Sequence, residues 1–194
     1  MTQSITRPQI DLVFDDVLSD DDCQKLIDIG NEFGFTPGTL SIQEEKLDAD
    51  DLYVDTSIRN CLQAPIDTPP DFFLKDKLFT VLKQARNMYQ FDVRGITDLQ
   101  LIKYDVGSYF KRHIDIGMYE SGAQRKITFI IQLSDPNDYT GGDLVLHTNP
   151  EATVMPRDKG SVIVFPAFFL HEVTPLLTGQ RYSLTGWCYG PPFK

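Results

Sequence analysis

The stretch RKITFIIQLSDPNDYTGGDLVLH, residues 125–147, decides the fold of this chain. Between residues 126 and 133 apolar and other side chains alternate with the period of a β-strand. One face of this strand is wholly apolar, which suits packing against helices, whereas Thr128 and Gln132 lie on the opposite face. A polar face that does not meet solvent is typical of the inner side of a barrel, so the pattern predicts a β-barrel-like region with a lined pocket.

Two amphipathic helices are expected before this region. Ser19 or Asp20 can cap the first, which Gly34 would end. Asp71 can cap the second, over residues 72–89. Both have an apolar stripe at helical spacing, so each is expected to pack one face against a sheet.

The segment between the two helices, residues 36–70, is rich in proline, glycine and acidic side chains, and has one β-like piece at residues 52–62. Two interpretations stay open for it. It can be a tolerant surface loop, or it can be a mobile lid over an active site, because long loops in compact domains are often functional.

After residue 95 the period changes to two, and about seven or eight strands with short turns follow. Helices segregated from an antiparallel sheet predict a mostly β, α+β layout or a double-stranded barrel buttressed by helices. A chain of 194 residues fits a single domain. We expect that domain to span residues 1–194, with a helical support region at about 15–95 and a β core at about 97–189.

Charge and cysteine content narrow the classes of partner. The formal net charge of −10 argues against nucleic acid or an anionic membrane as the main partner, and is compatible with a small molecule, a peptide or a basic protein. The three cysteines are widely separated and form no CxxC motif, which predicts reduced thiols in a cytoplasmic protein. No apolar stretch approaches the length of a membrane span.

The candidate chemistry begins with His113 and Asp115, two positions apart on an expected strand, where both side chains point to one face. One more imidazole would complete a 2-His-1-carboxylate triad, which leaves coordination positions open on non-haem Fe(II). The chain has only three histidines. His171 follows an apolar strand and is the better third ligand, whereas His147 ends a strand and is interpreted as structural.

Arg181 strengthens this interpretation. It follows His171 by ten residues across a turn, and it shares a strand face with Ser183, Thr185 and Trp187. A permanently charged guanidinium on an inward face needs an anion, yet no acidic residue shares that face of its strand. A bound dicarboxylate would supply the missing charge.

With these residues in place, the chain resembles the Fe(II)/2-oxoglutarate dioxygenases, and within them the prolyl 4-hydroxylase-like group. The resemblance rests on LQLIKYDVGSYFKRHID, RKITFIIQLSD…GGDLVLH and GSVIVFPAFFLHEVTPLLTGQRYSLTGW, in this order. It implies a double-stranded β-helix (jelly-roll or cupin-like) core. It also implies that His113, Asp115 and His171 bind iron and that Arg181 binds the distal carboxylate of 2-oxoglutarate.

Further residues carry implied roles. Tyr104 matches a tyrosine that hydrogen-bonds the same cosubstrate, Thr128 a small polar residue that lines its pocket, and Trp187 a tryptophan near the metal. Gln132 stands where animal oxygen-sensing prolyl hydroxylases have a tyrosine, which leaves its contact to the cosubstrate open. Arg59 looks like an arginine on the substrate side.

The implied reaction uses Fe(II), 2-oxoglutarate and O2, with ascorbate as a candidate additional reductant, and releases succinate and CO2 as it hydroxylates an unactivated C–H bond. The expected target is a prolyl residue in a protein or peptide. Alternatives with the same chemistry are a free amino acid, a small metabolite or an alkylated nucleobase. A non-catalytic binding or sensor module on the same fold is a third possibility.

Overall fold

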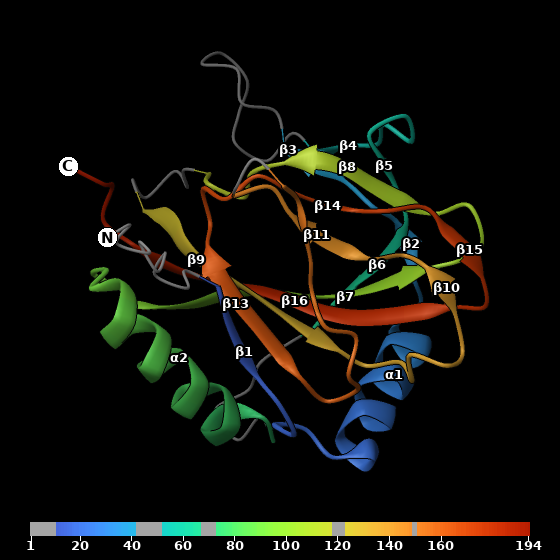
Figure 1. Cartoon of the computed structure of the whole chain (residues 1–194), viewed down its shortest axis with the longest axis horizontal. Coiled ribbons are helices and arrows are strands. Elements are labelled where there is room, and N and C mark those ends of the chain that lie inside the picture. Colours follow the sequence, from blue (N-terminus) through green and yellow to red (C-terminus); the bar gives the residue numbers. More distant parts are fainter. Residues whose placement is uncertain (1–10, 42–51, 67–72, 118–122, 149–150) are drawn as a thin grey trace, which may run out of the picture.

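The computed structural model describes residues 11–41, 52–66, 73–117, 123–148 and 151–194. Three layers are stacked in it: two helices, a large sheet and a smaller sheet (Figure 1). One apolar cluster lies between the helices and the large sheet, and a second lies between the two sheets. The functional residues predicted from sequence belong to the second of these spaces or to its edge.

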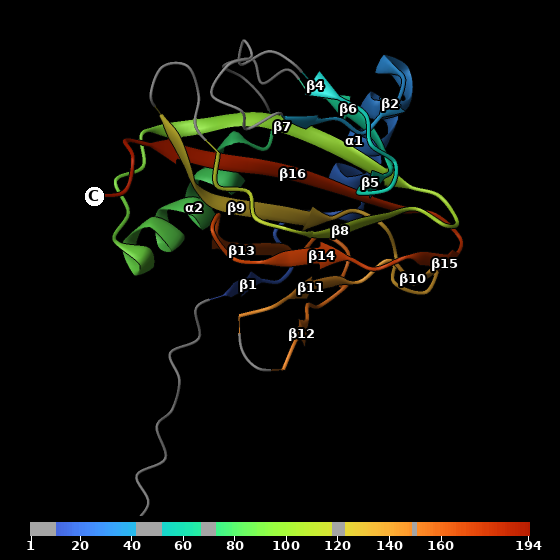
Figure 2. The same cartoon turned by 90° about the horizontal axis from the view of Figure 1, so that it is seen from above.

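The large sheet contains seven antiparallel strands in the order β1-β13-β9-β16-β7-β6-β2. Their bounds are β1 Leu12–Phe14, β13 Val162–Pro166, β9 Gln124–Gln132, β16 Arg181–Gly190, β7 Gly95–Tyr104, β6 Leu62–Pro65 and β2 Thr36–Pro37. The last strand of the chain, β16, lies between β7 and β9, and these three long strands run side by side in Figure 2.

The smaller sheet has the strand order β12-β11-β14-β8-β5. Its members are β12 Thr153–Val154, β11 Leu144–Leu146, β14 His171–Val173, β8 Tyr109–His113 and β5 Arg59–Asn60. Two further pairs complete the described strands: β10 Thr140–Gly141 with β15 Leu176–Thr178, and β3 Leu40–Ser41 with β4 Leu52–Tyr53. Two facing antiparallel sheets buttressed by helices confirm the predicted mostly β fold with a double-stranded β-helix core.

The two helices cover one face of the large sheet. Helix α1, Asp20–Phe33, begins with a capping box in which Ser19 and Asp22 each bind the other's backbone N–H, and its last turn is capped by Gly34 as predicted. Helix α2 spans Lys75–Tyr89, starts later than predicted, and has no side-chain cap at its first residue. The predicted cap Asp71 lies outside the described residues. Neither described helix is long and apolar enough to cross a membrane.

The alternation in β9 has the predicted consequence. Ile127, Phe129 and Ile131 are buried in the cluster that faces the helices. Ile130, on the opposite side, belongs to the cluster between the sheets. A single strand thereby builds both cores, and its inner face carries Thr128 and Gln132 into the space between the sheets.

The surface-loop interpretation of residues 36–70 is wrong for the part that the structure describes. Within residues 36–41 and 52–66, short strands join both sheets: β6 and β2 extend the large sheet, and β5 forms an edge of the small one. β5 lies within the β-like piece expected at residues 52–62, whereas β2 was not expected, and each of these strands is only two to four residues long. The lid interpretation concerns residues 42–51 and 67–70, which lie outside the described part.

Candidate metal centre and cosubstrate site

The smaller sheet brings His113 and His171 together. They are directly opposite each other where β8 meets β14, and their ring centres are 4.1 Å apart. Asp115 follows β8, and its backbone N–H is held by the carbonyl of Ala167 at 2.8 Å. Asp115 Oδ1 lies 3.5 Å from His113 Nε2, and Oδ2 lies 3.5 Å from His171 Nε2. The ligand atoms of the three residues all lie within 4.8 Å of one another.

Backbone carbonyls orient both imidazoles. His113 Nδ1 is 2.7 Å from the carbonyl oxygen of Lys111, and His171 Nδ1 is 2.9 Å from that of Phe169. Because a carbonyl oxygen only accepts, each Nδ1 carries the hydrogen and donates it, and each Nε2 keeps its lone pair for a metal ion. The stacked Phe110 ring, centred 3.6 Å from the His113 ring, restricts that imidazole further.

The charges of the triad suit a divalent cation. Burial alone would raise the pKa of Asp115, but the neighbouring His171 and His113 outweigh it and hold this pKa well below its usual range. Burial lowers the pKa of His171, so its imidazole is neutral at pH 7. Two imidazoles whose Nε2 atoms are free and one carboxylate are the donor set of the facial triad, and the residues therefore fit Fe(II).

Thr128 contacts the triad itself. Its hydroxyl donates to Asp115 Oδ2 at 2.8 Å, so the side chain supports a predicted metal ligand. Trp187 pairs with Thr128 across β16 and β9 and is buried, and its expected role near the metal stays a prediction. The guanidinium carbon of Arg125 lies 3.8 Å from the centre of the Trp187 ring.

Arg181 is the first residue of β16 and only 1% exposed. It lies opposite Tyr104 of β7, with its guanidinium carbon 5.1 Å from the centre of the Tyr104 ring. Nη2 donates to Gln132 Oε1 at 2.9 Å, while the buried Nη1 has no hydrogen-bond partner among the described residues. A buried guanidinium that lacks a carboxylate partner is unfavourable by itself, so this position fits one carboxylate of a diacid.

Tyr104 adds a protonated hydroxyl beside this cation. Burial raises the pKa of Tyr104 far above its ordinary value, although Arg181 and Arg59 act in the opposite direction. Its phenol therefore stays neutral and keeps a hydrogen to donate.

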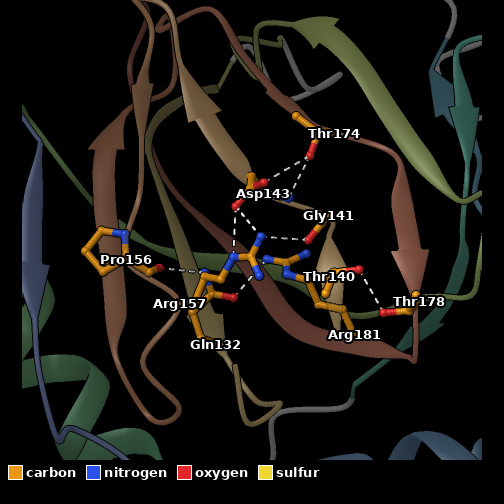
Figure 3. Close-up of polar contacts among 9 residues, drawn as sticks. All are labelled: Gln132, Thr140, Gly141, Asp143, Pro156, Arg157, Thr174, Thr178 and Arg181. Carbon is orange, nitrogen blue, oxygen red and sulfur yellow. Dashed lines mark hydrogen bonds and ion pairs between the residues drawn. The ribbon is translucent and has the colours of Figure 1, made fainter. Parts of the chain in front are cut away.

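A second arginine with partly buried polar contacts, Arg157, was not predicted from the sequence. Arg157 Nη2 donates to Asp143 Oδ1 and to the carbonyl of Gly141, at 2.6 and 3.1 Å (Figure 3). The hydroxyl of Thr174 accepts from the backbone N–H of Asp143 at 2.8 Å. In the sequence, Asp143 and Arg157 are separated by both β11 and β12, so no periodic signal links them.

His147 and Arg59 make contacts outside the triad. His147 lies outside the triad, and its Nε2 is 2.8 Å from Glu172 Oε1. Arg59 is buried at the edge of the small sheet, where it donates to the carbonyl of Thr39 at 2.7 Å and to the thiol sulfur of Cys61 at 3.3 Å. These contacts do not test whether Arg59 also binds a substrate, so that role stays a prediction.

Comparisons with known proteins agree with this geometry. The family described as the 2OG-Fe(II) oxygenase superfamily matches residues 99–189, which run from within β7 nearly to the end of β16. A PKHD-type hydroxylase of Gloeothece citriformis is 32% identical over 121 residues, which are 62% of this chain and 51% of that protein. The chain spans about half the length of the curated relatives it matches.

Solved structures share the fold. A viral collagen prolyl hydroxylase from Paramecium Bursaria Chlorella virus-1, in a 2OG complex, has a TM-score of 0.68 at 20% identity, over 94% of this chain and 97% of that one. A prolyl hydroxylase from Trichoplax adhaerens, in complex with a hypoxia inducible factor peptide fragment, has a TM-score of 0.69 at 19% identity, over 94% and 84%. Fe(II), 2-oxoglutarate and O2 are the cofactors and cosubstrates of this class, and the triad and Arg181 suit the first two. Over residues 99–189, the chain is similar to the 2OG-Fe(II) oxygenase superfamily.

Proposed function

We propose that this protein is a 2-oxoglutarate-dependent dioxygenase that hydroxylates an unactivated C–H bond of a prolyl residue in a protein or peptide. One observation carries the proposal: a metal-ligand triad and a buried arginine with an unused Nη1 occur together on the inner sides of two facing sheets. Neither a structural histidine pair nor a surface ion pair accounts for that combination.

Each residue has a separate task in this proposal. His113, Asp115 and His171 hold Fe(II) and leave coordination positions open, and Thr128 keeps the Asp115 carboxylate in place. Arg181 binds the distal carboxylate of 2-oxoglutarate, and Tyr104 donates a hydrogen bond from its neutral phenol. When bound, iron supplies the activation of O2 that couples decarboxylation of 2-oxoglutarate to hydroxylation.

The prolyl target is supported by the proteins to which this chain is similar. Curated relatives are called PKHD-type hydroxylases, and structures with the same fold are prolyl hydroxylases, one of them with a bound peptide. A proline-containing partner and a cytoplasmic location stay predictions for this chain.

The test is reconstitution with Fe(II), ascorbate and 2-oxoglutarate, with and without a library of proline-containing peptides. We expect succinate release that depends on both metal and peptide, and a gain of one oxygen atom on proline by mass spectrometry. Succinate without any modified peptide would redirect the search to free amino acids and other small substrates. No succinate above that of the His113→Ala variant would refute the enzyme assignment.

A further inference from the structure

Gln132 is a buried amide whose two ends contact different parts of the chain. The residue is 2% exposed. Its Nε2 donates to the carbonyl of Pro156 at 3.0 Å, and its Oε1 accepts from Arg181 Nη2 at 2.9 Å (Figure 3). The amide therefore connects the predicted cosubstrate arginine to the turn between β12 and β13.

Only one orientation of this amide satisfies both partners. A carbonyl oxygen can only accept a hydrogen bond, and a guanidinium can only donate one. If the amide turned over, the amide nitrogen would face Arg181 and the amide oxygen would face Pro156, and two buried contacts would be lost. Gln132 thus fixes Nη2 of Arg181 in one place.

The Pro156 carbonyl, which accepts from Gln132, lies in a turn that other contacts hold in place. The backbone of Gln132 binds this turn twice, because its N–H donates to Ser161 and its carbonyl accepts from Gly160, at 3.0 and 2.8 Å. Arg157, which follows Pro156, is held by Asp143. The Pro156 carbonyl is therefore a stationary support for the Gln132 side chain.

Gln132 holds Arg181 without neutralising it. An amide carries no net charge, so the guanidinium keeps its full positive charge and, among the described residues, an unpaired Nη1. We infer that Gln132 is a positioning residue for the cosubstrate: it immobilises Arg181 through Nη2 and leaves the charge and Nη1 for a carboxylate of the diacid. This inference rests on the proposed function.

Two substitutions separate charge from geometry. Gln132→Glu keeps the shape of the side chain and loses the hydrogen bond to Pro156, as Gln132→Met does, but it also places a carboxylate against Arg181, where it competes with the diacid. We expect the Kd for 2-oxoglutarate to rise at least about a hundredfold. Gln132→Met keeps the size but removes both hydrogen bonds, and we expect a rise of about tenfold, because a bond to a charged group is lost.

The readout is calorimetric titration of 2-oxoglutarate into the full chain loaded with Mn²⁺, which needs no turnover. Gln63→Met and Gln63→Glu are the matched controls, because the Gln63 amide donates to Thr39 and does not contact Arg181. We expect these controls to bind within about twofold of the wild type. The affinity for Mn²⁺ should stay unchanged in all four variants.

A double-mutant cycle tests the positioning role directly. If Gln132 acts through Arg181, Gln132→Met should change the Kd no further in an Arg181→Ala background. In turnover, Gln132→Met should raise KM for 2-oxoglutarate and leave kcat nearly unchanged. Because Gln132→Glu preserves shape, it tests the charge argument even if Gln132→Met yields little folded protein.

The outcomes are distinct. A wild-type protein that does not bind 2-oxoglutarate would overturn the proposed function. A wild type that binds it, with Gln132 variants equal to the Gln63 controls, would overturn only the role of Gln132. Equal losses with and without Arg181 would also overturn positioning, since Gln132 would then act independently of the arginine.

Discussion

At the scale of single residues, the metal centre depends on which nitrogen of each imidazole is free. Nδ1 of His113 donates to the carbonyl of Lys111, and Nδ1 of His171 donates to the carbonyl of Phe169. The Thr128 hydroxyl donates to Oδ2 of Asp115. The three ligand residues are therefore prepared by their surroundings before any ion binds, which reduces the ordering that binding must supply.

Removing a ligand should abolish metal binding without unfolding the chain. We expect His113→Ala or Asp115→Ala to weaken Mn²⁺ or Fe(II) binding more than about a hundredfold, because each removes a donor from a three-residue site. Equilibrium dialysis measures the loss, and circular dichroism checks the fold. His147→Ala is the matched control, since His147 pairs with Glu172 outside the triad. A comparable loss in that control would contradict the assignment.

The sequence predicted the members of this site but not their contacts. The HxD spacing was visible as a sequence pattern. Arg181 was visible because no acidic residue shares its face of the strand. The partners of Thr128 and Gln132 were not, because a hydroxyl or an amide reads only as a polar residue on an inner face. Which neighbour it binds depends on turns that the sequence does not specify.

At the scale of elements, the long strands were predictable and the short ones were not. β7, β9 and β16 carry enough alternating positions to reveal both faces. β5 falls within the β-like piece expected at residues 52–62, but β2 is a strand because β6 pairs with it, and this tertiary cause leaves no local signature. The surface-loop interpretation was wrong for residues 36–41 and 52–66 for that reason.

The turn that enters β11 should tolerate no side chain at Gly141. Its φ is +70°, and an added Cβ would lie 2.2 Å from the carbonyl oxygen of Pro175. We expect Gly141→Ala to lower the free energy of unfolding by about 2–4 kcal/mol, through both backbone strain and a clash with main chain. Urea denaturation measures it.

Gly34→Ala is the control for backbone strain alone. Gly34 also has a positive φ, of +85°, but a Cβ there meets nothing within 4 Å. We expect that variant to lose about 1–2 kcal/mol, less than Gly141→Ala, because it introduces backbone strain without a clash. Equal losses in the two variants would mean that the contact between β10 and β15 is looser than the structure places it.

At the scale of the whole molecule, the large sheet separates two apolar clusters. Two thiols buried in one of these clusters can show when it opens to solvent. Cys23 and Cys188 are both buried in the cluster beneath the helices. Burial raises the pKa of Cys23 to about 11 and that of Cys188 to about 12. Reactive thiolate is therefore nearly absent at neutral pH while this core is closed.

These thiols should be alkylated only when the core opens. At pH 8 we expect iodoacetamide to label Cys23 and Cys188 at the rate of global unfolding, followed by mass spectrometry across a urea series. Because both pKa values are raised on folding, their contribution to stability is present below about pH 9 and is lost as the pH rises towards 11 or 12. Rapid labelling of Cys188 in native buffer would show that the core beneath the helices is open.

The central place of β16 also bears on biosynthesis. A ribosome releases β7 and β9 well before residues 181–190, the strand that joins them. Until that segment leaves the exit tunnel, the nascent chain carries two unpaired edges and lacks the arginine that anchors the diacid. Folding of this domain therefore waits for residues 181–190, and the third predicted metal ligand, His171, is synthesised only ten residues before Arg181.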